Sequence, residues 1–181
     1  MENSLFNIQS NQGNTIHVSA IREKDAWGVC DFVIANEQRL KAFFPKTLEQ
    51  NLTPELAEIF TRLKTKQFNA KEEYLFTLRE EKSRKIIGLI YIKELSKVQG
   101  QGEFAYCIDY NYEGHGIVSK ATSQLVNYAF EKLDLNRLQI IAHKDNLGSI
   151  KVAENCGFTW QKTLPEEYKG MDMELYELFK N

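Results

Sequence analysis

The chain has 181 residues, 43% of them hydrophobic and 27% charged, which is enough to bury a sizeable core. A formal net charge of −2 gives no overall basic surface, so no direct nucleic-acid partner is expected. The three cysteines and three histidines are scattered and no apolar run approaches ~20 residues, which argues against a disulfide framework, a metal site and a membrane span. The polar N-terminus has no secretion signal, and the sequence therefore predicts a cytoplasmic protein.

The first elements are a strand and two helices. The polar stretch 1–13 is expected to be flexible or loosely packed, and the β-branched residues of 15–22 predict a strand. A helix is expected over 26–36, with its large apolar residues, Trp27 among them, in the core. The segment TPELAEIFTRLKTKQF (53–68) has threonine at the N-cap and proline at the first helical position, which strongly predicts a second helix.

A set of strands follows. EYLFTLRE (73–80) and KIIGLIYIKEL (85–95), joined by a charged turn, predict an antiparallel hairpin, and GEFAYCIDY (102–110) predicts a third strand. Gly88, inside the hairpin, indicates a bulge or a close backbone approach.

The C-terminal third alternates helices and strands. After a glycine-rich loop, apolar residues at helical spacing predict a helix with one buried face, formed by Val118, Ala121, Leu125, Ala129 and Leu133. A buried strand at 138–144, a short helix at 147–155 and two closing strands at 158–164 and 171–180 complete the order β-α-α-β-β-β-α-β-α-β-β. No repeat or linker divides the chain, so we expect one α/β domain with a mixed sheet over residues 1–181.

The glycine-rich loop YEGHGIVSK (112–120) offers backbone amides at the start of a helix. Gly114 and Gly116 permit positive φ and a close approach, and a helix N-terminus attracts anions. The loop fits neither the Walker pattern nor the dinucleotide fingerprint, and by itself such a turn is often only a turn.

The surrounding sequence resembles the GNAT superfamily of N-acetyltransferases, most closely the RimJ/RimL type that acetylates ribosomal-protein N-termini. In that family a strand reading roughly A-E-I-G-Y-W runs into Y-Q-G-K-G-Y-A-T-E-A, and a later N-x-x-S precedes C-G-F or L-G-F. The counterparts here are Glu103–Cys107, Tyr112–Ala121, Asn146 with Ser149, and Cys156–Phe158. RLKAFFP (39–45) resembles the family's acceptor-side segment, and the likeness spans nearly the whole chain.

The resemblance implies a GNAT-like domain whose central sheet splays, acetyl-CoA as co-substrate and no metal. The diphosphate and pantetheine of CoA would contact residues of the strand end, the loop and the later motif: Ile108, Glu113, Gly114, His115, Gly116, Ile117, Val118, Ser119, Asn146 and Ser149. Three departures from the family pattern, Glu113, Val118 and Gln161, predict weakened CoA affinity and remove one glutamate base. His115 stands where lysine is frequent, and a solvated loop histidine is the alternative.

Two residues are candidates for catalysis by the same resemblance. Glu103 matches the general base of the histone-acetylating branch, and an exposed strand carboxylate is the alternative. Ser149 matches a hydroxyl that protonates the leaving thiolate, and a helix-start hydroxyl near Asn146 is the alternative. Asp172, Glu166 and Glu167 are further candidates at the acceptor side.

Three functions stay open at this point. The first is acetylation of a protein or peptide N-terminus, because an α-amine with pKa ~7.7–8.0 needs less help from a base than a lysine-like amine near 10.4. The second is acetylation of a small-molecule amine such as a polyamine, amino sugar or amino acid. The third is a CoA-binding module without turnover. The expected partners are acetyl-CoA and an amine acceptor, and an oligomer of identical chains is compatible with each function.

Overall fold

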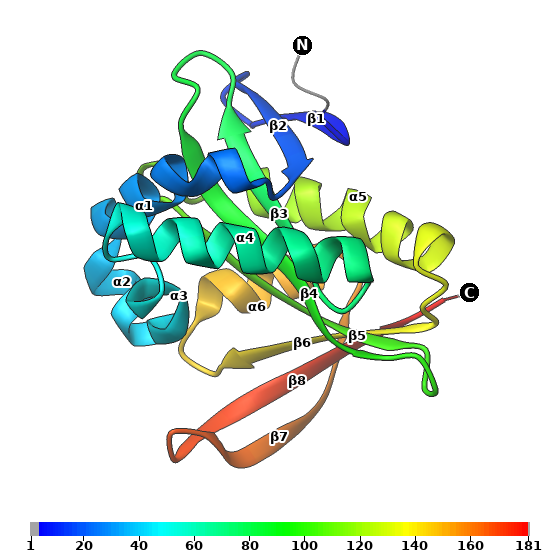
Figure 1. The fold of residues 1–181 in the computed structure, drawn as a ribbon. Coiled ribbons are helices and arrows are strands. Elements are labelled where there is room, and N and C mark those ends of the chain that lie inside the picture. Colours follow the sequence, from blue (N-terminus) through cyan, green and yellow to red (C-terminus); the bar gives the residue numbers. More distant parts are fainter. Residues whose placement is uncertain (1–3, 181) are drawn as a thin grey trace. The chain divides into compact units, whose positions relative to one another are not determined.

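Strands and helices alternate along the chain in a computed structural model that describes residues 4–180 (Figure 1). The chain divides into two compact units. Unit 1 comprises residues up to Tyr91 together with Tyr106–Ile117, and unit 2 comprises Ile92–Ala105 together with residues from Val118 onward. The mixed α/β fold class predicted from the sequence is confirmed.

Unit 1 contains four neighbouring strands in the order β1-β2-β3-β4, with antiparallel pairing of β1 with β2 and of β2 with β3. Helices α1 and α4 lie side by side (Figure 1) and pack through Ala26, Cys30 and Ala57. Its elements are β1 (Phe6–Gln9), β2 (Thr15–Ala20), η1 (Glu23–Asp25), α1 (Ala26–Ala35), α2 (Glu37–Phe43), α3 (Pro45–Glu49), α4 (Pro54–Ala70), β3 (Tyr74–Glu80), the first part of β4 (Ile86–Ser96), the end of β5 (Gln101–Ile108) and η2 (Tyr110–Tyr112).

Unit 2 contains the second part of β4 and the first part of β5, followed by α5 (Ile117–Lys132), β6 (Arg137–His143), α6 (Leu147–Asn155), β7 (Thr159–Tyr168) and β8 (Met171–Phe179). Strand β5 pairs in parallel with β6 from Gln101↔Arg137 to Phe104↔Ile140. Strand β6 pairs with β8 along its whole length, and β8 pairs with β7 in the hairpin drawn orange and red in Figure 1.

Apolar side chains of β5 and β6 form part of the core of unit 2. Phe104 and Ile140 are each 1% exposed, and the Phe104 ring meets Phe158 edge to face at 6.3 Å. The helix face predicted for α5 is buried at Val118, Ala121, Leu125 and Ala129, which confirms the periodicity argument; Leu133 follows the end of the helix. Alternation along a strand places the polar residues of β5 and β6 on the opposite face.

The N-terminal part of the chain differs from the sequence prediction. Residues 6–9 form β1 and Ile8 is 7% exposed, so the expectation of a loose stretch does not hold there; residues 1–3 lie outside the described range. The two short helices α2 and α3 were not predicted. Trp27 is 64% exposed and was wrongly assigned to the core, whereas Ala26 and Cys30 of the same helix are buried against Ala57 of α4.

Gly88 lies where two strands of unit 1 approach closely. A Cβ atom on Gly88 would stand 2.7 Å from the Cys107 carbonyl oxygen and 3.0 Å from Leu78 Cδ1, and a Cβ essentially never lies this close to another atom. The close approach predicted from the sequence is therefore confirmed.

Replacing Gly88 with alanine should lower the free energy of unfolding by about 1–3 kcal/mol, because a backbone oxygen cannot move aside without shifting the strand. Urea unfolding followed by circular dichroism measures this change. Gly148→Ala is the matched control, since its Cβ would meet only Asn146 Oδ1 at 3.8 Å, and it should leave stability unchanged or raise it by up to about 1 kcal/mol. Equal stability of the Gly88→Ala and parent chains would contradict the packing argument.

Candidate functional site

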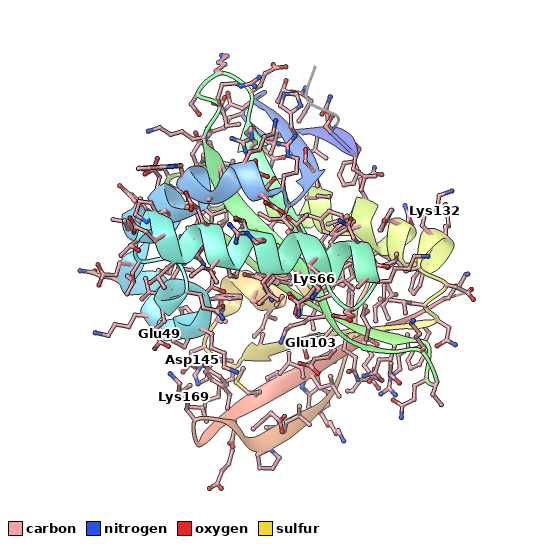
Figure 2. All side chains as sticks on the ribbon, in the orientation of Figure 1. Glu49, Lys66, Glu103, Lys132, Asp145 and Lys169 are labelled. Atoms are coloured by element: carbon pink, nitrogen blue, oxygen red, sulfur yellow. The ribbon has the colours of Figure 1, made fainter. Side chains whose placement is uncertain are left out.

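The glycine-rich loop connects η2 to the first residue of α5. Gly114 and Gly116 have φ of +72° and +71°, the left-handed region in which a side chain is strained. Such a turn brings successive backbone amides to the N-terminal end of α5, where the first N–H groups of a helix have no intrahelical partner. Figure 2 places Lys132 at the other end of this helix, so the end at the loop is the one that favours an anion.

The two sides of the loop have different surroundings. A Cβ on Gly116 would lie 2.9 Å from the side-chain amide atoms of Asn11, and the backbone N–H of Asn11 donates a 2.9 Å hydrogen bond to the His115 carbonyl. A Cβ on Gly114 would meet nothing within 4 Å. The turn between β1 and β2 therefore contacts the loop on the Gly116 side, and the Gly114 side is open. An open side with exposed backbone amides is compatible with anion binding.

The remaining loop residues contribute backbone more than side chain. Ile117 and Val118 are buried, so only their amides are available to a ligand. His115 Nε2 lies 2.9 Å from Gln12 Nε2, and its ring meets Tyr112 at 6.2 Å between centroids. These contacts give His115 a structural role, and its role toward a cofactor stays a prediction.

The last backbone N–H groups of β5 point in different directions relative to β4. Asp109 N–H donates to the Ile87 carbonyl at 2.7 Å and is therefore occupied. Because N–H groups alternate in direction along a strand, the Ile108 N–H points the other way. The Ile108 amide, predicted from the sequence to contact the cofactor, therefore points away from β4.

Glu113 has a partner that sequence reasoning missed. Its carboxylate forms an ion pair with Arg39 of α2, and a second guanidinium nitrogen of Arg39 donates to the Ile108 carbonyl at 3.4 Å. From the sequence, the Glu113 carboxylate was expected to repel the cofactor phosphates and weaken CoA affinity. The ion pair removes that objection, since Arg39 neutralises the charge.

Glu103 lies on the polar face of β5 in unit 2 (Figure 2). Its carboxylate pairs with Lys93 Nζ at 2.9 Å, and its side chain is only 14% exposed. Neither detail fits the alternative of an exposed carboxylate. The ion pair holds the carboxylate in place, and it also means that Glu103 is already neutralised by a cation.

A hydrogen-bonded polar network continues across the same face. Gln139, the register partner of Glu103, accepts from Gln101 at 2.7 Å and donates to Glu177 at 2.6 Å. Glu177 also pairs with Arg137. Gln139 and Glu177 are 9% and 5% exposed, so a buried polar layer stands where an apolar one would be usual.

Asn146 and Ser149 come together at the start of α6. Asn146 is the N-cap, and its side-chain oxygen accepts the Ser149 backbone N–H at 3.2 Å. The spacing N-x-x-S thus has a local cause, because the asparagine caps the helix that carries the serine. The structure gives Asn146 the role of helix cap, and the roles of Asn146 and Ser149 toward CoA and the leaving thiolate stay predictions.

The cysteine thiols are poor nucleophiles. Burial raises the pKa of Cys107 to about 12 and that of Cys156 to about 11, and burial also raises the pKa of Cys30. At neutral pH each is a thiol rather than a thiolate. Acyl transfer through a cysteine is therefore disfavoured, and direct attack by an acceptor is the simpler chemistry.

Residues 4–180 lack two features, a metal site and a membrane-spanning helix. No group of three or more His, Cys, Asp and Glu side chains is arranged to hold a metal ion within that range. Across the same residues, no helix has the length and apolar character needed to cross a bilayer.

Known proteins with similar sequences and folds are acetyltransferases. One relative, "Putative ribosomal N-acetyltransferase YdaF" of Bacillus subtilis (strain 168), is 30% identical over 162 residues, 85% of this chain and 82% of that protein. Another, "Spermidine N(1)-acetyltransferase" of Escherichia coli (strain K12), is 30% identical over 81 residues, 45% of this chain and 44% of that protein.

A solved structure gives the same fold. Mycobacterium smegmatis RimJ in complex with CoA-disulfide superposes with a TM-score of 0.85 at 14% identity, covering 96% of this chain and 86% of that one. Residues 16–159 match the family described as "Acetyltransferase (GNAT) domain". The match covers most of the chain and favours the enzymatic readings over a CoA-binding module without turnover. The chain therefore belongs to the GNAT acetyltransferase family and is an N-acetyltransferase.

Proposed function

We propose that this N-acetyltransferase takes acetyl-CoA as donor and acetylates the N-terminal α-amine of a protein or peptide. The diphosphate of CoA would bind the amides of Gly114–Ser119, with its charge facing the N-terminal end of α5. The open side of Gly114 supports this assignment, as does the bound CoA of the similar RimJ structure.

The observation that carries the choice of acceptor is the Lys93–Glu103 ion pair. The Lys93 ammonium already occupies a Glu103 carboxylate oxygen, so an acceptor that needs little help from a base suits this site. At pH 7 an α-amine costs about 1.4 kcal/mol to deprotonate, and a lysine-like amine about 4.6 kcal/mol. The α-amine therefore suits this site better.

The remaining steps fall to other residues of the chain. The Ile108 N–H, directed away from β4, would donate to the oxygen of the thioester as negative charge develops there. Ser149, held at the first turn of α6, would give a proton to the leaving thiolate. With a thiol pKa near 8.5, that proton helps the reaction without being essential.

A small-molecule amine is the second candidate, and the match to a spermidine acetyltransferase favours it. That match covers less than half of either protein, whereas the ribosomal-type relative matches over most of both. A polyamine also calls for unpaired carboxylates, and both glutamates of the polar face, Glu103 and Glu177, are paired with cations. A cytoplasmic location stays a prediction from the sequence.

The acceptor is tested by measuring thiol release from acetyl-CoA with a panel of amines at pH 7. Peptides that begin with Ser, Ala or Met should give a kcat/KM at least tenfold above spermidine, an amino sugar and a free amino acid, because their α-amines are less basic than the spermidine amines and are presented by a peptide chain. The same peptides with acetylated N-termini are the control and should release no thiol. A preference for spermidine would replace the proposal with the second candidate.

A further inference from the structure

Four contacts within unit 1 join the helical segment after α1 to the loop that precedes α5. Arg39 of α2 pairs with Glu113 and donates to the Ile108 carbonyl at 3.4 Å. Asn36, at the junction of α1 and α2, donates to Asp109 Oδ2 at 3.2 Å and accepts from Tyr110 N–H at the same distance. All four contacts reach residues 108–113, between the end of β5 and the glycines.

We propose that Arg39 is a positioning residue that couples the acceptor-side segment to the acetyl-CoA loop. It neutralises the Glu113 carboxylate on the loop, and it fixes α2 to the peptide group that carries the Ile108 carbonyl. This inference rests on the proposed function, since the loop must receive acetyl-CoA, and on the resemblance of residues 39–45 to the acceptor-side segment of the family.

The chemistry of arginine suits both tasks at once. Its planar guanidinium has several N–H donors in a fixed fork, so one side chain can hold a carboxylate and a carbonyl together. Lysine carries the same charge without the fork. Lysine at position 39 would keep the neutralisation of Glu113 and lose the simultaneous grip on Ile108.

The surroundings of Arg39 allow it to be replaced without unfolding the chain. Asn36 is 4% exposed and additionally donates to the Phe32 carbonyl at 2.9 Å, so the beginning of α2 remains anchored without the arginine. Both partners of the ion pair are partly exposed, at 36% and 47% for Arg39 and Glu113. Removing Arg39 should therefore change ligand binding more than folding.

The charge part of the proposal is tested with CoA affinities from titration calorimetry. Arg39→Ala leaves the Glu113 carboxylate uncompensated on the loop and should weaken CoA binding about fivefold. Glu113→Gln should bind CoA at least as tightly as the parent, because it removes the negative charge. The double variant should return to within about twofold of the parent, since neither charge remains. Arg62→Ala, an exposed arginine on α4 of the same unit, is the matched control and should not change the affinity.

The coupling part is tested by steady-state kinetics with the best peptide of the panel. Arg39→Ala and the double variant lose both Arg39 contacts, so the acceptor KM should rise about threefold to tenfold in each, with kcat changed less. Glu113→Gln keeps the contact of Arg39 with the Ile108 carbonyl and should raise the acceptor KM less. Arg39→Lys should restore CoA affinity without restoring the acceptor KM. If Arg39 had a purely structural role, the variants would shift the melting temperature, and Arg39→Lys would not separate the CoA affinity from the acceptor KM.

Two results would overturn the inference. One is equal CoA affinity of Arg39→Ala and the double variant, which would show that Glu113 is not what Arg39 neutralises. The other is an unchanged acceptor KM in every variant. A parent chain that neither binds CoA nor releases thiol would instead refute the proposed function, and the inference with it.

Discussion

Glu103→Gln should lower kcat at pH 7 by about 10²–10⁴-fold if the carboxylate receives the amine proton, because general-base catalysis typically contributes that much. The affinity for acetyl-CoA should stay within a few-fold of the parent, since Glu103 lies on the polar face of β5 and not on the loop. Part of the loss should disappear as the pH rises toward the pKa of the acceptor amine. A pH profile of kcat and kcat/KM measures all three.

Lys93→Met is the matched control for this substitution. It breaks the same 2.9 Å ion pair and keeps the carboxylate, so a loss of activity caused only by the broken pair would appear in both variants. We expect Lys93→Met to retain activity or raise it, because the Glu103 carboxylate is kept and no ammonium occupies it any longer. Full activity of Glu103→Gln at pH 7 would show that Glu103 is structural. The enzyme would then act by positioning an already neutral α-amine.

Helix ends were predictable where a residue type strongly favours one position, such as the N-cap, the first turn or the residue after the helix. Thr53 and Pro54 fix the start of α4, and the Thr53 hydroxyl accepts the Leu56 N–H as expected. Helix α6 spans the predicted 147–155, because Asn146 caps its start and the Gly157 backbone at φ +84° follows its end. Such signals lie within a few residues of one another and need no tertiary information.

The ion pairs of the site were not predictable in the same way. Arg39 and Glu113 are 74 positions apart, and the sequence assigned them to an acceptor segment and a cofactor loop without any sign that they meet. Exposed Trp27 shows the same limit, since the periodicity of a helix does not say which face meets another element. Only the packed chain decides which charges become partners and which apolar residues stay outside.

Gly116→Ala should abolish most of the thermal stabilisation that CoA gives to the parent chain. At a CoA concentration 100-fold above Kd, the parent should gain about 2.7 kcal/mol, or about 5–10 °C in melting temperature. Alanine at position 116 is strained at φ +71°, and its Cβ would clash with the Asn11 side chain. The backbone N–H of Asn11 donates to the His115 carbonyl, so a shift of Asn11 should also move the loop. The loop amides should therefore move out of line with the diphosphate. Melting with and without CoA measures the effect.

Two other glycines separate backbone strain from ligand binding. Gly114 and Gly170 both have φ of +72° and an open Cβ position, so each alanine variant should cost about 1–2 kcal/mol in the absence of CoA. Gly170 lies in the turn between β7 and β8, far along the chain from the loop, and Gly170→Ala should keep the full CoA-dependent shift. Gly114→Ala places its methyl on the open side of the loop and should lose much of it. An undiminished CoA-dependent shift in both Gly114→Ala and Gly116→Ala would show that the diphosphate does not bind at this loop, because each substitution should displace the backbone amides that are proposed to bind it.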